Sequence, residues 1–412
     1  MAIEDPVSAA GRRSDRVGRG TVRPDAASLA AFATLCTYTW FLYGLGPALP
    51  LFRDELGTSS AVAGLHSLML AVGVVIAGFS GVTFARRWRR YGVAQRGIIT
   101  LTVAVLLFTA GSMLAGAELA VTLPAMILVG LGGGVAVNTS TTVLQAHNGI
   151  YGPSMLTIGN AAAAGVGLIT PLAIGAATAA GWTWRAAMVL IIPFAVTALV
   201  LVTRNRTVAA YAAVPVGRAG FTFRGLPSAY WPAALAVVCS VAIEFCMVTW
   251  TPDLLTARTG MTPGTASGAV SAVVGGMALG RLLVGALATR RSPLMLFLVS
   301  VGVTAAGWLL VWLSTAPVAA IAALLIVGIG VAGQYPLGAA MVMALSGGQP
   351  DRAIAVMSIG VGIASGLGPF LLGALADQLG VRTAFLVVPA LCAIGAICIC
   401  VGQARGTRPN RP

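Results

Sequence analysis

The sequence predicts an all-α integral membrane protein, in which twelve transmembrane helices form two six-helix bundles that are parallel repeats of each other. Three observations support this fold. The chain is 58% hydrophobic and only 9% charged, its apolar runs reach membrane-crossing length twelve times, and its two halves share motifs. A run of about 20 apolar residues is enough for a helix to cross the hydrocarbon core of a bilayer, and a helix satisfies its own backbone hydrogen bonds there.

Each apolar run predicts one helix, and the runs follow one another with short polar interruptions. The predicted spans are 28–52, 59–84, 97–116, 120–145, 153–179, 184–203, 229–256, 264–289, 293–314, 317–345, 352–376 and 383–402. The longest interruption, 204–228, lies between the sixth and seventh spans. It divides the chain into a disordered tail (1–27), an N-terminal bundle (28–203), a linker (204–228), a C-terminal bundle (229–402) and a second tail (403–412).

The net charge of +14 reflects topology rather than nucleic-acid binding. All but four of the 25 basic residues fall in segments on the side of the N-terminus, and those left for the opposite side are Arg53, Arg185, Arg258 and Arg382. Cytoplasmic loops carry such an excess of arginine. We therefore expect a multi-pass protein of the inner (cytoplasmic) membrane with both termini and the linker in the cytoplasm, and no nucleic-acid partner.

Motifs recur at matching places in the two halves. Spans two and eight each carry two glycines seventeen residues apart and end in paired arginines, the second glycines being Gly81 and Gly285. Spans four and ten match as VGLGGGVAVN and VGIGVAGQYP, and spans five and eleven share a proline four residues before a glycine. Matching spans are separated by six, so the halves keep the same orientation and a substrate would lie between them.

These repeats resemble the major facilitator superfamily of secondary transporters, which implies alternating access. The loop between spans two and three fits that family's motif at Gly81, Arg86, Arg89 and Arg90, with a second copy at Gly285 and Arg290. Ala85 and Thr289 stand where the family has an acid, and Trp88 where it has a second glycine. The charge lock that those acids provide in the family is therefore not expected here.

The resemblance implies that spans one, four, seven and ten line the substrate pathway. Polar spacing agrees, because Asn138, Thr142 and Gln145 share one helical face, as do Glu244 and Thr251. Some of these groups could instead bond only between helices. The predicted substrate-binding residues are Trp40, Tyr43, Asn138, Thr142, Gln145, Glu244, Thr251, Gln334 and Tyr335.

Glu244 is the only acid inside a membrane-length apolar segment, which makes it a functional candidate. It could carry a coupled proton, or it could stay protonated and donate to a neighbouring carbonyl. His66 is a second candidate proton carrier, unless it is only a satisfied polar residue. Arg281 lies near the end of span eight, where snorkelling to the interface is the simpler interpretation. If it pointed inward, it would favour an anionic substrate.

No enzyme constellation, metal-ligand cluster or nucleotide-binding loop is visible in the sequence, so we expect no cofactor and no ATP drive. The prediction is a proton-coupled uptake carrier (symporter) for a small neutral or cationic solute, a monomer whose partners are substrate, protons and lipid. The alternatives are a drug or metabolite exporter, a facilitative carrier or pore, and a sensor on the same fold. Span five, TPLAIG at 170–175, departs from the exporter pattern of paired glycines.

Overall fold

The computed structural model describes residues 23–212, 225–288 and 290–406, and every regular element in them is helical. These residues include twelve helices that are long and apolar enough to cross a membrane, which confirms the predicted fold class. The first six spans are α2 (Ala26–Leu56), α3 (Ser60–Gly111, two spans), α4 (Glu118–Asn148), α5 (Gly152–Ala179), and α6 with α7 (Trp184–Val189, Ile191–Arg204). A 3₁₀ turn, Gly149–Tyr151, joins α4 to α5.

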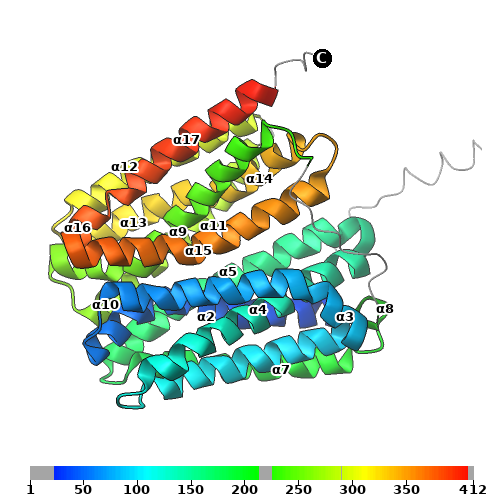
Figure 1. The fold of residues 1–412 in the computed structure, drawn as a ribbon, viewed down its shortest axis with the longest axis horizontal. Coiled ribbons are helices and arrows are strands. Elements are labelled where there is room, and N and C mark those ends of the chain that lie inside the picture. Colours follow the sequence, from blue (N-terminus) through cyan, green and yellow to red (C-terminus); the bar gives the residue numbers. More distant parts are fainter. Residues whose placement is uncertain (1–22, 213–224, 289, 407–412) are drawn as a thin grey trace, which may run out of the picture.

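The second six spans begin after the short helix α8 (Ala209–Ala212). They are α9 (Tyr230–Thr259), α10 with α11 (Pro263–Ala269, Ser271–Leu287), α12 (Pro293–Leu313), α13 with α14 (Pro317–Ala332, Gln334–Ala344), α15 (Pro350–Leu379), and α16 with α17 (Val381–Ala384, Val387–Gly406). In Figure 1, helices α2 to α7 lie together as one bundle and α9 to α17 as another. Apart from Ala63, the buried residues of the largest apolar core belong to the second bundle.

The repeated glycines of spans four and ten pack alike in the two bundles. A Cβ on Gly130 would lie 3.0 Å from the Cα of Gly73, and a Cβ on Gly276 would lie 3.0 Å from the Cα of Gly328. In each bundle the helices therefore approach at a pair of glycines, which lets their backbones come close. The GLGGG run is thus a helix-packing segment, as its position inside an apolar span predicts.

The structure differs from the predicted boundaries mainly where polar sequence remains helical. Within α3 the backbone departs from helical angles at Arg89 alone, with φ 55° and ψ 168°, where the chain turns between spans two and three. The arginine-rich segment predicted as a loop is thus mostly helix. In the predicted linker, 209–212 is helical and 213–224 lies outside the described residues, as do tail residues 1–22 and 407–412.

Several contacts between the bundles lie toward one end, which we call the Arg53 end; the end at which spans two and three join is the Arg90 end. The Ser267 hydroxyl donates to the carbonyl of Pro47 at 2.9 Å, and a Cβ on Gly175 would lie 3.1 Å from the Cα of Gly268. The matching Gly373 of span eleven approaches the backbone of Ser60. The repeated proline-glycine motifs therefore bring both bundles together at the Arg53 end.

Candidate functional site

The candidate site centres on a hydrogen bond between the two bundles. The Tyr43 hydroxyl, on α2, donates to Oε1 of Glu244, on α9, over 2.9 Å. Both side chains are partly buried, and both stand near the middle of their helices. A carboxylate at this depth is costly unless it is paired or hydrogen-bonded. The sequence predicted both residues for the substrate pathway, and the structure brings them together.

The Arg281 side chain lies near this pair and does not extend toward the C-terminal end of α11. Its side chain is exposed in the protein, and it interacts electrostatically with both Tyr43 and Glu244. Helical side chains lean toward the N-terminus of their helix, and the N-terminus of α11 faces the Arg53 end. Arg281 therefore leans back toward the middle of the bundle. The snorkelling interpretation is replaced by the inward one.

A fourth helix supports Tyr43 from the side. A Cβ on Gly167, in α5, would come within 2.8 Å of the Tyr43 ring and 3.1 Å of Thr39. One residue further along α5, the carbonyl of Leu168 accepts a 2.8 Å hydrogen bond from Ser271 at the start of α11. The cluster thus lies where α2 and α5 of one bundle meet α9 and α11 of the other, and each bundle contributes to it.

Two predicted substrate residues lie elsewhere. Trp40 is buried within the first bundle, donates from Nε1 to the carbonyl of Ala187 at 3.0 Å, and stacks on Phe194. Gln334 is fully buried in the second bundle and donates to the Thr304 hydroxyl at 2.7 Å. Both satisfy their donor groups inside one bundle, as polar groups in lipid must. Neither joins the Tyr43–Glu244 cluster.

His66 is also enclosed in the first bundle. It has no exposed surface, and its Nε2 lies 2.9 Å from the Thr122 hydroxyl while Nδ1 lies 3.1 Å from the carbonyl of Val62. The rings of Phe52 and Phe108 pack against it. The structure therefore places His66 as a satisfied core residue and separates it from Glu244, which matches the simpler of the two interpretations.

The remaining predicted substrate residues differ in exposure. Asn138, Thr142 and Gln145 are all exposed on α4, consistent with one shared polar face, and Tyr335 is 41% exposed. Thr251 is fully buried, and its hydroxyl has no hydrogen-bond partner in the described part of the chain. The span-four face and Tyr335 are exposed, and their place in the pathway stays a prediction.

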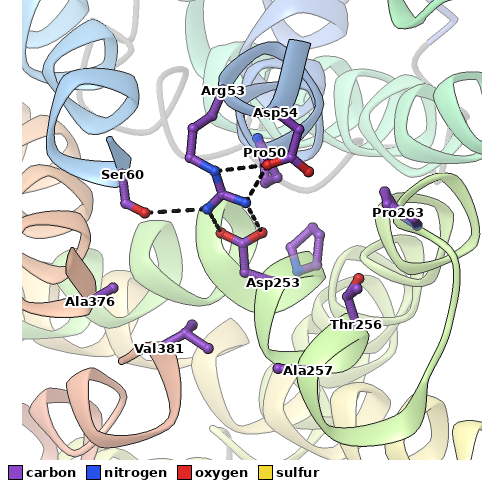
Figure 2. A pocket seen from close by; sticks show the side chains of 11 residues that line it. Pro50, Arg53, Asp54, Ser60, Asp253, Thr256, Ala257, Pro263, Ala376 and Val381 are labelled. Atoms are coloured by element: carbon purple, nitrogen blue, oxygen red, sulfur yellow. Dashed lines mark hydrogen bonds and ion pairs between the residues drawn. The ribbon is translucent and has the colours of Figure 1, made fainter. Parts of the chain in front are cut away.

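A second polar network joins the bundles at the Arg53 end, beside a pocket of about 320 Å³. Figure 2 shows Arg53 of α2 between Asp54, Ser60 and Asp253. Its Nη1 lies 2.6 Å from Oδ2 of Asp253 and its Nη2 lies 3.1 Å from Oδ1, a two-point ion pair between α2 and α9. Such planar, bidentate pairs are the stronger class of charge contact.

Asp377 completes this network from α15. Its two carboxylate oxygens accept the backbone N–H groups of Ser60 and Ala61, each at 2.8 Å, at the start of α3. An acid at a helix N-terminus satisfies unpaired N–H groups and complements the helix dipole. Ser60 also accepts from Arg53 at 3.2 Å. Asp253, Arg53, Ser60 and Asp377, which we call the Arg53 latch, thus link α9, α2, α3 and α15.

At the Arg90 end, the two copies of the predicted loop motif are loosely packed around their glycines. A Cβ on Gly81 or on Gly285 would meet no atom within 4 Å. Arg90 donates weakly to the carbonyl of Ala210 at 3.4 Å, and Arg96 lies over the Trp88 ring at 4.6 Å. Arg90 thus contacts α8 of the linker and Arg96 contacts its own helix pair, and Ala85 contributes no carboxylate to reach across.

The latch residues are the functional candidates that sequence reasoning passed over. Arg53 was assigned only to topology, and Asp253 and Asp377 were not singled out. A usable signal was present, because Arg53 and Asp253 close matching spans, one and seven, with opposite charges. No cluster of three or more potential metal-ligating side chains occurs in the ranges that the structure describes.

The fold and these contacts define a membrane carrier built from two six-helix repeats. The sequence profile of the Major Facilitator Superfamily matches residues 26–332 and 233–412, so the chain belongs to that family. No curated protein sequence matches it.

Solved structures of this fold include three informative neighbours. A mutant of the peptide transporter POT is 12% identical, with a TM-score of 0.75 over 94% of this chain and 96% of that one. A mutant of the nucleoside transporter NupG is 11% identical, with a TM-score of 0.71 over 92% and 98%. A bacterial homologue of the human lysosomal transporter Spinster is 16% identical, with a TM-score of 0.64 over 92% of each chain. At these identities the likeness establishes the fold alone.

Proposed function

We propose that this protein is a proton-coupled secondary transporter that takes up a small solute across the cytoplasmic membrane by alternating access, with Glu244 as the proton-coupling residue. The observation that carries the proposal is the hydrogen bond from Tyr43 to Glu244. It joins the two bundles near the middle of the membrane helices, where a two-repeat carrier binds its substrate.

Protonation of Glu244 changes the strength of this contact. As a carboxylate, Glu244 accepts a charge-assisted hydrogen bond and faces Arg281; as a neutral acid, it loses the charge that both partners respond to. A hydrogen bond to a charged group contributes about 1.5–3 kcal/mol. A difference of that size shifts the balance between two conformations by roughly tenfold to a hundredfold. Proton binding can therefore bias the movement of one bundle against the other.

Alternating access also requires a gate, and the Arg53 latch is suited to that role. It holds four helices from both bundles together at one end. The arginine asymmetry of the sequence supports placing the Arg53 end outside the cytoplasm. In that orientation the described contacts close the path to the exterior, and the loosely packed motif glycines Gly81 and Gly285 face the cytoplasm. The degraded exporter pattern in span five supports uptake as the direction.

A variant of Glu244 tests this function. Purified protein is first screened by thermal shift to find a stabilising solute, since a ligand that binds the folded state raises its stability. Protein in liposomes is then assayed for pH-driven accumulation and for exchange of that solute. We expect Glu244→Gln to abolish accumulation and to retain exchange, because exchange needs only the loaded carrier to reorient. The control is Glu118→Gln at the start of α4.

If Glu244→Gln accumulates the solute against its gradient at the wild-type rate and with the same pH dependence, the proton-coupling role is contradicted. Loss of both activities together would assign Glu244 to the structure of the site rather than to coupling. The Glu118 variant should resemble the wild type in both assays, because its carboxylate lies at the start of α4 and accepts a hydrogen bond from the backbone N–H of Gly116, just before that helix.

A further inference from the structure

We propose that the solute is a small organic anion, a monocarboxylate, whose carboxylate binds Arg281 when Glu244 is protonated. This inference rests on the function proposed above and specifies the class of substrate. It differs from the neutral or cationic solute that the sequence suggests, because that suggestion assumed that Arg281 faces the interface.

The first argument is the position of Arg281. Its guanidinium stands at the junction of the two bundles, interacts with Tyr43 and Glu244, and is still exposed. A guanidinium offers five donors in a planar fork that matches a carboxylate at two points. Glu244 is engaged with Tyr43 and cannot use all of them. An exposed, incompletely used cation between the bundles is suited to a second carboxylate.

The second argument is the charge balance of the cluster. With Glu244 ionised, Glu244 and Arg281 cancel each other. A solute carboxylate added to that state would set two anions against one cation, and like charges a few ångströms apart are strongly unfavourable where water is scarce. Once Glu244 takes up a proton, the cluster carries one positive charge, and one monocarboxylate restores neutrality. Proton and anion are therefore expected to bind together.

The groups around Glu244 allow this assignment. Tyr43 comes from α2 and Arg281 from α11. Of the other helices packed on α9, α14 brings Tyr335 as a titratable residue, and α15 has its described charges, Arg352 and Asp377, near its ends. Helix α17 has Cys392, Cys398 and Cys400, with Arg405 in its last turn, and the short α16 has Arg382. Asp253 lies more than two turns along α9 and is paired with Arg53. Arg281 is thus the cation that the described residues place at Glu244.

A binding experiment with matched pairs of compounds tests the proposal. Acetate, lactate and benzoate are compared with acetamide, lactamide and benzamide, and alanine serves as a zwitterion. Thermal shift of the full-length protein in detergent is measured at pH 5.5 and pH 7.5. We expect at least one carboxylate to stabilise the protein, more strongly at pH 5.5, and its amide to have no effect. Arg281→Gln should weaken binding by roughly tenfold to a hundredfold, the range of a charged hydrogen bond.

Three further variants separate the effect of charge on binding from effects on folding and on proton coupling. Arg281→Lys keeps the cation and should retain part of the affinity, whereas Arg204→Gln, at the end of α7, should bind as the wild type does. Glu244→Gln should bind the same carboxylate with little dependence on pH. If Arg281→Gln melts well below the wild type without any ligand, the Arg281→Lys variant carries the comparison.

The carboxylate assignment would be overturned by an amide that binds as well as its carboxylate, by carboxylate binding that Arg281→Gln leaves unchanged, or by the failure of every carboxylate in the panel to bind. Selective, pH-dependent binding of alanine would overturn it in favour of a zwitterion and leave proton coupling intact. If the affinity for a carboxylate depends on Arg281 but changes neither with pH nor in Glu244→Gln, the substrate class is supported and the proposed coupling is contradicted.

Discussion

Tyr43 and Glu244 lie on different bundles, and the 2.9 Å hydrogen bond from the Tyr43 hydroxyl to the Glu244 carboxylate joins the bundles close to their midplane. A contact in this place must be broken or remade whenever one bundle moves against the other. It therefore connects the chemistry of one titratable side chain to the conformation of the whole carrier.

Removal of the Tyr43 hydroxyl should weaken transport, because Glu244 loses its partner from the other bundle. We expect Tyr43→Phe to lower pH-driven uptake by about tenfold or more, which corresponds to the loss of one hydrogen bond to a charged group. Tyr38→Phe is the matched control, since the Tyr38 ring packs on Gly133 within its own bundle. Equal losses in both variants would argue against a special role of the Tyr43–Glu244 contact.

Displacement of the Tyr43 ring should have a similar effect without changing any polar group. Gly167→Ala introduces a methyl group 2.8 Å from Tyr43, which the ring must move to avoid. Gly165→Ala, on the same helix, meets nothing within 4 Å and serves as the control. Uptake and melting temperature should both fall for the first variant and stay near wild type for the second. A fully active Gly167→Ala protein would show that the position of Tyr43 is not critical.

Loss of the ion pair in the Arg53 latch should open that end. A cysteine at position 256, which lines the pocket there, is introduced into protein whose six native cysteines are replaced. Asp253→Asn should raise its reaction rate with an aqueous thiol reagent severalfold, because a partly buried ion pair contributes on the order of 1 kcal/mol. Asp54→Asn, which changes the more exposed partner of Arg53, should have less effect. Unchanged reactivity in Asp253→Asn would remove Asp253 from the gate.

The polar face of span four can be tested by accessibility. Cysteines at positions 138 and 145 should react with aqueous thiol reagents and be protected by a bound solute, because both side chains are exposed. Position 136 is the control, since Ala136 is fully buried between helices. Identical reactivity at the three positions would mean that this face does not line the pathway.

Orientation in the membrane follows from the arginine asymmetry. In intact cells, a membrane-impermeant reagent should label a cysteine at position 118 and spare cysteines at positions 15, 215 and 408. Labelling at position 215 from outside would invert or break the twelve-span topology.

The sequence predicted the fold well because its strongest signals are local. Apolar length identified the spans, and the glycines repeated in spans four and ten proved to be helix contacts. Long-range pairing was not predictable in the same way. Trp40 and Gln334 were placed in the pathway because the family resemblance implicates spans one and ten, yet each found its partner within one bundle. Which neighbouring helix a polar side chain meets cannot be read from its position within a span.

Charged residues near helix ends show the same limit. Arg281 and Arg53 lie near helix ends, where an arginine is ordinarily explained by its position at the membrane interface. Their observed interactions instead involve residues far away in the chain. Only the packed structure shows that Arg281 leans toward the middle of the bundle and that Arg53 meets an acid of the opposite bundle.

The Arg53 latch has a consequence for leakage. Because the Arg53 guanidinium contacts Asp253 and Ser60 together, and the Ser60 N–H group in turn donates to Asp377, each of the four helices is bonded to at least one other, and α2 and α3 are each bonded to two. Partial opening of the Arg53 end therefore frees few helices, and we expect this end to open as a unit or to remain closed. If transport is proton-coupled as proposed, this property also protects the membrane's ion gradient, since a carrier that opened gradually would let ions leak through.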